Sequence, residues 1–144
     1  MPDTNKPNCD PKFIKQVRES YIRCQENPKF FDIFYRTLLG KSKEIEKKFE
    51  HTDWVRQHSL IKLAIKSAIL YAEQPDYAFA YKNIDDIGTT HSHSQWNIKP
   101  DLYPLWLDSV VESVQVCDPV CSPELSVAWR DVLTPAIDLI ISKY

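Results

Sequence analysis

The chain has 144 residues, a length that fits one domain with a single buried core. Hydrophobic residues make up 43% of it and charged residues 26%, and the net charge of −2 supplies no basic field for nucleic acid or an acidic membrane. No apolar run approaches the roughly 20 residues of a membrane-spanning helix. The opening residues, MPDTNKPNCD, lack the layout of a secretory signal, so we expect a cytoplasmic protein.

Helices dominate the elements that the sequence predicts. It contains two glycines and no sustained alternation of period two, so strand signals are nearly absent. Three prolines stand where helices should begin. The residue before each proline offers an oxygen to a free N–H of the first turn, and proline has no N–H to leave unpaired. These pairs are Asp10-Pro11, Asn27-Pro28 and Ser122-Pro123. The predicted fold class is all-α.

The first nine residues are predicted to be flexible, ahead of a single domain over 10–144. The first helix is predicted over Pro11–Gln25 and the second over Pro28–Leu39. Gly40 follows the second helix, and we expect it in the left-handed conformation that is common just past helix ends. A short helical turn over Ser42–Lys48 comes next.

A long helix is predicted from Thr52, as its cap, to about Ala72, with Asp53 in the positive first turn. Apolar and polar residues expected on its buried face recur at helical spacing: Gln57, Ile61, Ala64, Ile65 and Ala68. Over residues 73–85 the pattern weakens, and we expect a loop or a short irregular helix. A brief helix near residues 86–92 is predicted to carry two histidines.

The last two helices are predicted over Pro100–Val116 and Ser122–Ser142. Pro135 lies inside the final helix and should kink it, because proline removes one backbone hydrogen bond. We therefore expect one domain of six to eight helices.

His91 and His93 are the most informative candidates for chemistry. Two histidines can form a metal site, but residues two apart on a helix point to opposite sides and cannot easily share one ion. At most one of the two should face a pocket.

Three segments resemble bacterial globins of the three-over-three kind: FFDIFYRTLLGKSKEIEKKFEHTDWVRQ, IGTTHSHSQWNIKPDLYPLW and SPELSVAWRDVL. They resemble the family's second and third helices with the corner into the distal helix, its proximal helix with the opening of the next, and its final helix. The resemblance runs from about Phe30 to Ser142. It implies a helical sandwich around a haem pocket. Because no CxxCH pattern occurs, the implied cofactor is non-covalent haem b.

The resemblance also implies roles for single residues. Phe49 matches the corner phenylalanine that packs on the porphyrin, Tyr35 the residue above the iron, and Gln57 the distal polar residue. Other positions match residues that line the pocket: Leu60 and Ile61 beside the bound gas, and Ile98, Tyr103 and Trp106 along the proximal and inner edge.

The proximal ligand has two candidates. His93 lies seven residues before Pro100, a spacing seen in many globins. His91 is preceded by Ile87 and Thr90, whose carbonyl and hydroxyl are suited to accept the second ring N–H. We favour His91, with Ile87 lining the pocket and with His93 as the alternative.

The implied function is reversible binding of O2, with NO and CO as further ligands. Hydrogen bonds from Tyr35 and Gln57 should slow O2 release, which fits sensing, scavenging or NO and redox chemistry better than bulk transport. Dioxygenase or peroxidase activity would need a separate reductase as electron donor. His58 is a candidate sixth ligand of a bis-histidyl haem. A haem-free globin-like module that acts through protein contacts in sensing or stress is the other alternative. In either case we expect a monomer or a homodimer.

Overall fold

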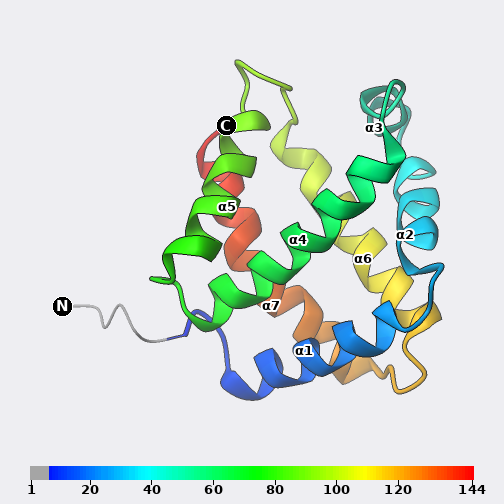
Figure 1. The fold of residues 1–144 in the computed structure, drawn as a ribbon, viewed down its shortest axis with the longest axis vertical. Coiled ribbons are helices and arrows are strands. Elements are labelled where there is room, and N and C mark those ends of the chain that lie inside the picture. The colour runs from blue at the N-terminus through cyan, green and yellow to red at the C-terminus, as the bar shows by residue number, and fades with distance from the viewer. Residues whose placement is uncertain (1–6) are drawn as a thin grey trace.

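The computed structural model describes residues 7–144, within which the elements are seven α-helices and one 3₁₀ turn (Figure 1). Residues 1–6, most of the predicted flexible N-terminus, lie outside the described part. The elements in chain order are α1 (Pro11–Gln25), α2 (Phe30–Leu39), α3 (Lys43–Lys48), α4 (Trp54–Glu73), α5 (Ala78–Thr90), η1 (Pro100–Leu102), α6 (Tyr103–Cys117) and α7 (Pro123–Ser142).

Apart from the short α3, the helices form two layers of three, with α1, α4 and α5 in one layer and α2, α6 and α7 in the other. The α2 helix packs on α6, α6 packs on α7, and α1, α4 and α5 all pack on α7. Figure 1 shows α4 crossing in front of α6 and α7. This arrangement confirms the predicted all-α, three-over-three class. No helix within residues 7–144 combines the length and the hydropathy that crossing a membrane requires.

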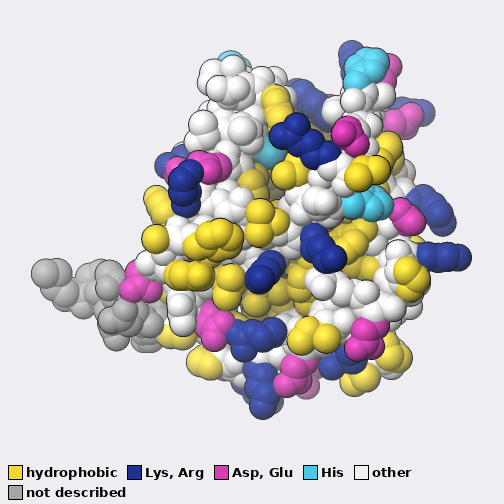
Figure 2. All heavy atoms as spheres, viewed as in Figure 1, with side chains coloured by type: hydrophobic (Ala, Val, Ile, Leu, Met, Phe, Trp, Pro, Cys, Tyr) yellow, Lys and Arg dark blue, Asp and Glu magenta, His cyan; other side chains and the backbone are white. Residues whose placement is uncertain are grey.

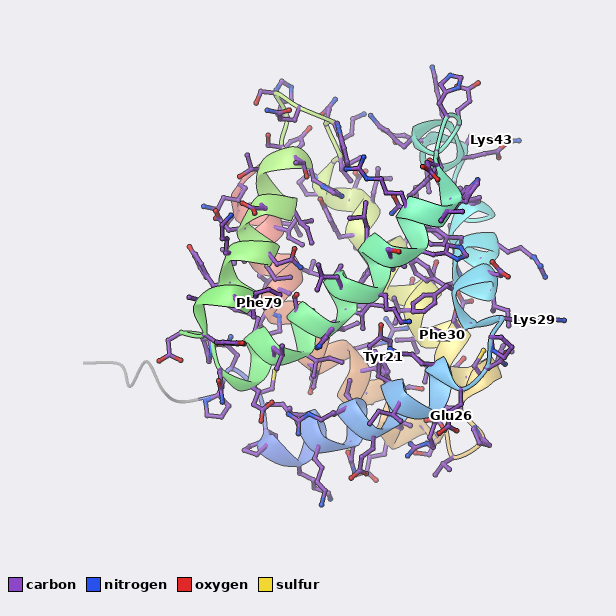
Figure 3. The ribbon with its side chains drawn as sticks, in the orientation of Figure 1. Tyr21, Glu26, Lys29, Phe30, Lys43 and Phe79 are labelled. Atoms are coloured by element: carbon purple, nitrogen blue, oxygen red, sulfur yellow. The ribbon has the colours of Figure 1, made fainter. Side chains whose placement is uncertain are left out.

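Large aromatic side chains fill the core where α1, α2 and α7 meet. Trp129 and Phe30 are fully buried, and Tyr21 meets both rings edge-on at 6.1 and 6.4 Å. Figure 3 shows Tyr21 and Phe30 between α1 and the start of α2. Burying each such side chain stabilises the fold by roughly 1.5–3 kcal/mol. These aromatic contacts therefore hold α1, α2 and α7 together.

Two of the predicted helix starts are confirmed and one is displaced. Asp10 accepts from the backbone N–H of Lys12 at 2.9 Å, and Ser122 accepts from that of Leu125 at 3.2 Å. The prediction that α2 begins at Pro28 was wrong. The side chain of Asn27 accepts from the N–H of Lys29 and closes a separate turn, so α2 begins only at Phe30.

Two local predictions between α2 and α4 were also wrong. Gly40 is right-handed, with φ of −77°, because the N–H of Lys41 bonds to the carbonyl of Leu38 and the turn continues the helical sense. Asp53, and not Thr52, caps α4, since its carboxylate accepts from the N–H of Arg56 at 3.3 Å. Both residues have suitable oxygens, and only the backbone path distinguishes them.

The largest correction concerns α5. It begins at Ala78 and runs to Thr90, whereas we expected a loop or a short irregular helix over residues 73–85 and a brief helix near residues 86–92. Its buried stripe is narrow, with Ala80, Ile84 and Gly88 at spacings of four. Small residues give a weak hydrophobic pattern although they allow close packing on α7. The final helix continues through Pro135, and the kink there stays a prediction.

Candidate functional site

The α4 and α5 helices meet at one end and diverge toward the other (Figure 1). Near their meeting point, the Asn83 amide of α5 donates to the Ser67 hydroxyl of α4 at 2.8 Å. Residues three or four apart share a helix face. One and two turns beyond Ser67, α4 therefore turns Leu63 and Leu60 toward the opening, and α5 turns Ile87 and then His91 toward it.

We call this opening, with Leu60 and Leu63 on α4 and Ile87 and His91 on α5, the recess. Leu60 is 43% exposed and Leu63 38% exposed, which is unusual for leucines on an inward side of the fold. Neither α4 nor α5 packs extensively on α6 in the part of the chain that the structure describes. Figure 2 shows hydrophobic side chains gathered along α4 and α5 and between them. The recess therefore has exposed apolar side chains on its α4 side.

The inner end of the recess carries residues of α2 and α6. Phe34 packs edge-on against Trp106 at 5.9 Å, and Ile98 is half-buried against the core. Tyr103 is 8% exposed. Burial raises the pKa of Tyr103, which keeps this phenol neutral.

A polar pair stands on the α4 side of the recess. The side-chain amide of Gln57 donates to the Tyr35 hydroxyl at 3.0 Å, and that hydroxyl lies 3.5 Å from the Gln57 carbonyl. Tyr35 is 4% exposed. Its burial raises the pKa, which the bond from Gln57 lowers only in part, so the phenol keeps its proton near neutral pH. The pair offers an O–H and N–H donors beside an apolar surface.

Aromatic rings surround Tyr35. The ring centroids of Phe49 and Trp54 lie 5.7 and 5.1 Å from that of Tyr35. The Phe49 and Trp54 rings stack on each other, with centroids 5.8 Å apart. Sequence reasoning missed Trp54. Its signal was the spacing of one helical turn before Gln57 and His58, which places it on the same end of α4.

His58 lies on the α2 side of this cluster. Its ring is parallel to that of Tyr35, with centroids 5.7 Å apart, and its Nε2 lies 3.5 Å from a carboxylate oxygen of Asp32. Ile61 is buried, while its neighbour Leu60 is exposed. Adjacent helical residues are about 100° apart, so these two predicted wall residues do not share one face.

The two candidate ligands differ in surroundings. His91 caps the end of α5 and is half-buried, with Nδ1 3.1 Å from the Thr90 hydroxyl, which itself donates to the Ile87 carbonyl at 3.0 Å. Burial lowers the pKa of His91, against the opposing effect of a bond to the Ile87 backbone. His93 is exposed. Trp96, a further residue that sequence reasoning missed, lies 5.2 Å from the His91 ring.

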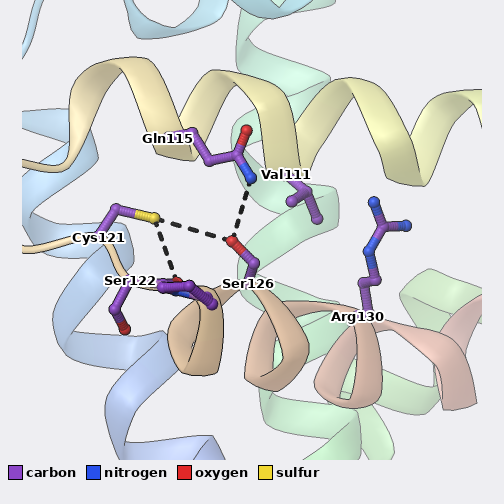
Figure 4. A pocket seen from close by; sticks show the side chains of 7 residues that line it. Val111, Gln115, Cys121, Ser122, Ser126 and Arg130 are labelled. Atoms are coloured by element: carbon purple, nitrogen blue, oxygen red, sulfur yellow. Dashed lines mark hydrogen bonds between the residues drawn. The ribbon is translucent and has the colours of Figure 1, made fainter.

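Other features lie apart from these residues. No group of three or more histidine, cysteine or acidic side chains could hold a metal ion within residues 7–144. A surface groove between α6 and α7 contains Cys121 and Arg130, and there Gln115 donates to Ser126 at 3.3 Å (Figure 4). None of its lining residues belongs to the predicted site.

Comparisons with known proteins bear on the fold. No protein family model matches the sequence, and no curated protein matches it. A crystal structure from Pseudomonas aeruginosa PAO1, described as structurally highly homologous to a human hemoglobin, is similar with a TM-score of 0.86. The sequences are 36% identical over 92% of this chain and 98% of that one. The identity, the coverage and the three-over-three architecture agree with one another, and the chain belongs to the globin family.

Proposed function

We propose that this globin binds haem b without a covalent bond in the recess between α4 and α5 and uses it to bind O2 reversibly. The observation that carries the proposal is the apolar opening itself, in which Leu60 and Leu63 of α4 stand exposed opposite Ile87 and His91 of α5. A flat apolar cofactor would cover these leucines, and each square ångström of apolar surface removed from water contributes about 25 cal/mol.

The residues present fit such a group. Apolar side chains line both diverging helices, and Phe49 and Trp106 are half-buried hydrophobics at the edges of the same region. One imidazole stands at the end of α5. A recess with apolar walls and one nitrogen ligand matches what a haem requires of its protein.

His91 is the residue proposed to bind the iron of such a haem. The Thr90 hydroxyl lies beside its Nδ1 and can accept the proton there, which leaves Nε2 free to bind a metal. The tautomer is inferred from these neighbours. The exposure of His93 also supports the choice of His91.

Haem, when bound, supplies an iron with one open position for a diatomic gas. Tyr35 and Gln57 would then donate hydrogen bonds to a ligand that carries partial negative charge, as O2 does and CO does much less. Bonds to charged groups are worth about 1.5–3 kcal/mol, or roughly ten-fold or more in the rate of release. The proposal therefore includes slow O2 release and a preference for O2 over CO beyond that of a recess without donors.

Slow release suits sensing, scavenging or the reaction of O2 with NO. The last of these, like peroxidase chemistry, would need electrons from a separate reductase. A bis-histidyl haem with His58 as second ligand is the alternative, although the contact of His58 with Asp32 favours a place beside the recess.

The test is an absorption spectrum of the purified protein, with haemin added, in the ferric, ferrous and CO-treated forms. A Soret band that shifts on reduction and again with CO would support the proposal. A ferrous spectrum of two strong-field ligands would indicate the bis-histidyl alternative. Protein that retains no haem absorption after excess haemin is removed would overturn the proposal in favour of a haem-free module.

A further inference from the structure

The end of α7 lies unusually close to α5, one turn before His91. A Cβ atom on Gly88 would stand 2.7 Å from Cγ of Lys143 and 3.3 Å from Cα of Ile140. Real Cβ atoms essentially never approach that closely, so a larger residue here would force Lys143 or the backbone at Ile140 to shift. On the same side, Nζ of Lys143 lies 2.7 Å from a carboxylate oxygen of Asp85. The rotation of α5 about its own axis is thereby set against α7.

Tyr144, the residue after Lys143, reaches the loop that follows α5. Its hydroxyl donates to the side-chain carbonyl of Asn97 at 2.6 Å. Asn97 has φ of +52°, a left-handed conformation that costs energy for a residue other than glycine and therefore needs support from its surroundings. The Asn97 N–H bonds to the Ser92 carbonyl at 2.9 Å. Tyr144 thus binds the loop at Asn97, its left-handed residue.

The same ring contacts His93. The His93 and Tyr144 rings meet edge-on, with centroids 5.7 Å apart and planes at 89°. Either of the two imidazoles in this short segment could face the recess, because a small rearrangement of the loop can exchange the positions of residues two apart. His91 lies on the α5 face that carries Ile87, while His93 is held against Tyr144 outside it.

We propose that Tyr144 is a positioning residue that decides which histidine serves as axial ligand, by keeping the His93 ring outside the recess and the 91–98 loop closed. This inference rests on the proposed function. The ring and the hydroxyl have separable roles. The ring holds His93, and the hydroxyl holds Asn97 and thus the loop.

The experiment compares Tyr144→Ala and Tyr144→Phe, each alone and combined with His93→Ala, after loading with haemin. The readouts are the electron paramagnetic resonance spectrum of the ferric protein and the iron–imidazole stretching band of the ferrous protein. Tyr144→Ala should give two populations of axial coordination in place of one, and the added His93→Ala change should return it to one. Tyr144→Phe keeps the ring and should retain the single population.

A second readout needs no cofactor. In the haem-free protein, both Tyr144 variants should accelerate hydrogen exchange of the Asn97 and Ile98 amides at least five-fold, because both lack the hydroxyl. Phe79→Ala is the matched control. It also removes an exposed aromatic ring, but at the opposite end of α5 (Figure 3), and should change neither readout.

The outcomes separate the two proposals. A wild type without a Soret band would overturn the proposed function and this inference with it. A wild type with a normal haem spectrum and a Tyr144→Ala variant that shows the same single population would overturn this inference alone. So would two populations that persist after His93→Ala, since His93 would then not be the competing ligand.

Discussion

The amide of Gln57 donates a 3.0 Å hydrogen bond to the hydroxyl of Tyr35, which joins α4 to α2 beside the recess. The bond orients the phenol while its own proton makes only a long contact, at 3.5 Å, with the Gln57 carbonyl. Tyr35 is therefore held in place with its donor almost free.

Tyr35→Phe should raise the O2 dissociation rate of the haem-loaded protein at least several-fold, because it removes the O–H donor and leaves the ring. The rate is measured by replacement of O2 with CO in a stopped-flow instrument. Tyr21→Phe is the control, since it removes another buried hydroxyl, which donates to the Lys62 carbonyl in a different part of the core. An unchanged rate in Tyr35→Phe would remove the phenol from the proposed function.

Leu63→Ser tests the apolar wall of the recess. Since Leu63 is already 38% exposed without a cofactor, the unfolding free energy of the haem-free protein should change by only about 0.5 kcal/mol. Haem loss to an excess of an acceptor protein should be several-fold faster. Val55→Ser changes an 84% exposed residue of the same helix and should leave haem loss unaltered. Equal rates of haem loss in wild type and Leu63→Ser would place the cofactor elsewhere.

The two glycines predict opposite effects of one substitution. Gly88→Ala should lower the free energy of unfolding by about 1–3 kcal/mol, because the new methyl group meets Lys143 and the backbone at Ile140. Gly40→Ala should raise it by about 0.4–1 kcal/mol, since Gly40 is right-handed and a Cβ there has only ordinary contacts at 3.5 Å. Urea denaturation of the haem-free variants measures both. A Gly88→Ala protein as stable as Gly40→Ala would show that α5 and α7 can separate freely.

Sequence patterns predict the parts of this fold that local chemistry determines. The bounds of α1 and the caps Asp10 and Ser122 follow from a polar residue before a proline and from a wide apolar stripe. The start of α5 could not be found in this way. Its buried face consists largely of small residues, and what places them inside is their close contact with α7, which no local pattern contains.

In the candidate site too, some features could be predicted from the sequence and others depend on contacts between distant segments. The resemblance brought Tyr35 and Gln57 together, and the structure places them in direct contact. Trp54 and Trp96 were missed because each is partly exposed and is identified only by the ring it touches. The separate surroundings of His91 and His93 depend on Tyr144, which is 47 residues from Asn97 in sequence. Spacing alone left both histidines open.

Asp118 gives a prediction about acid stability. It is buried, and it accepts hydrogen bonds from Ser20 at 2.6 Å and from Arg23 at 2.8 Å. Burial raises the pKa of Asp118, but these bonds outweigh that effect and hold the pKa below its usual value. The carboxylate therefore stabilises the fold above about pH 4, and this contribution is lost as the pH falls further, through the lowered pKa.

Asp118→Asn should cost about 1.5–3 kcal/mol at neutral pH, because the hydrogen bonds from Arg23 and Ser20 lose their charged acceptor. The difference from wild type should shrink when unfolding is measured at progressively lower pH below 4. Asp108→Asn removes the exposed ion pair with Arg130 and should cost only about 0–1 kcal/mol. A difference between Asp118→Asn and wild type that does not change with pH would show that the charge of Asp118 is not what stabilises the protein.

The central claim is that the imidazole at the end of α5 binds the iron of a haem. The most direct measurement is the ferrous absorption spectrum of haemin-loaded His91→Ala beside that of His93→Ala. We predict that His91→Ala loses the five-coordinate imidazole spectrum or fails to retain haem, and that His93→Ala matches the wild type. A normal spectrum in His91→Ala together with its loss in His93→Ala would contradict the account.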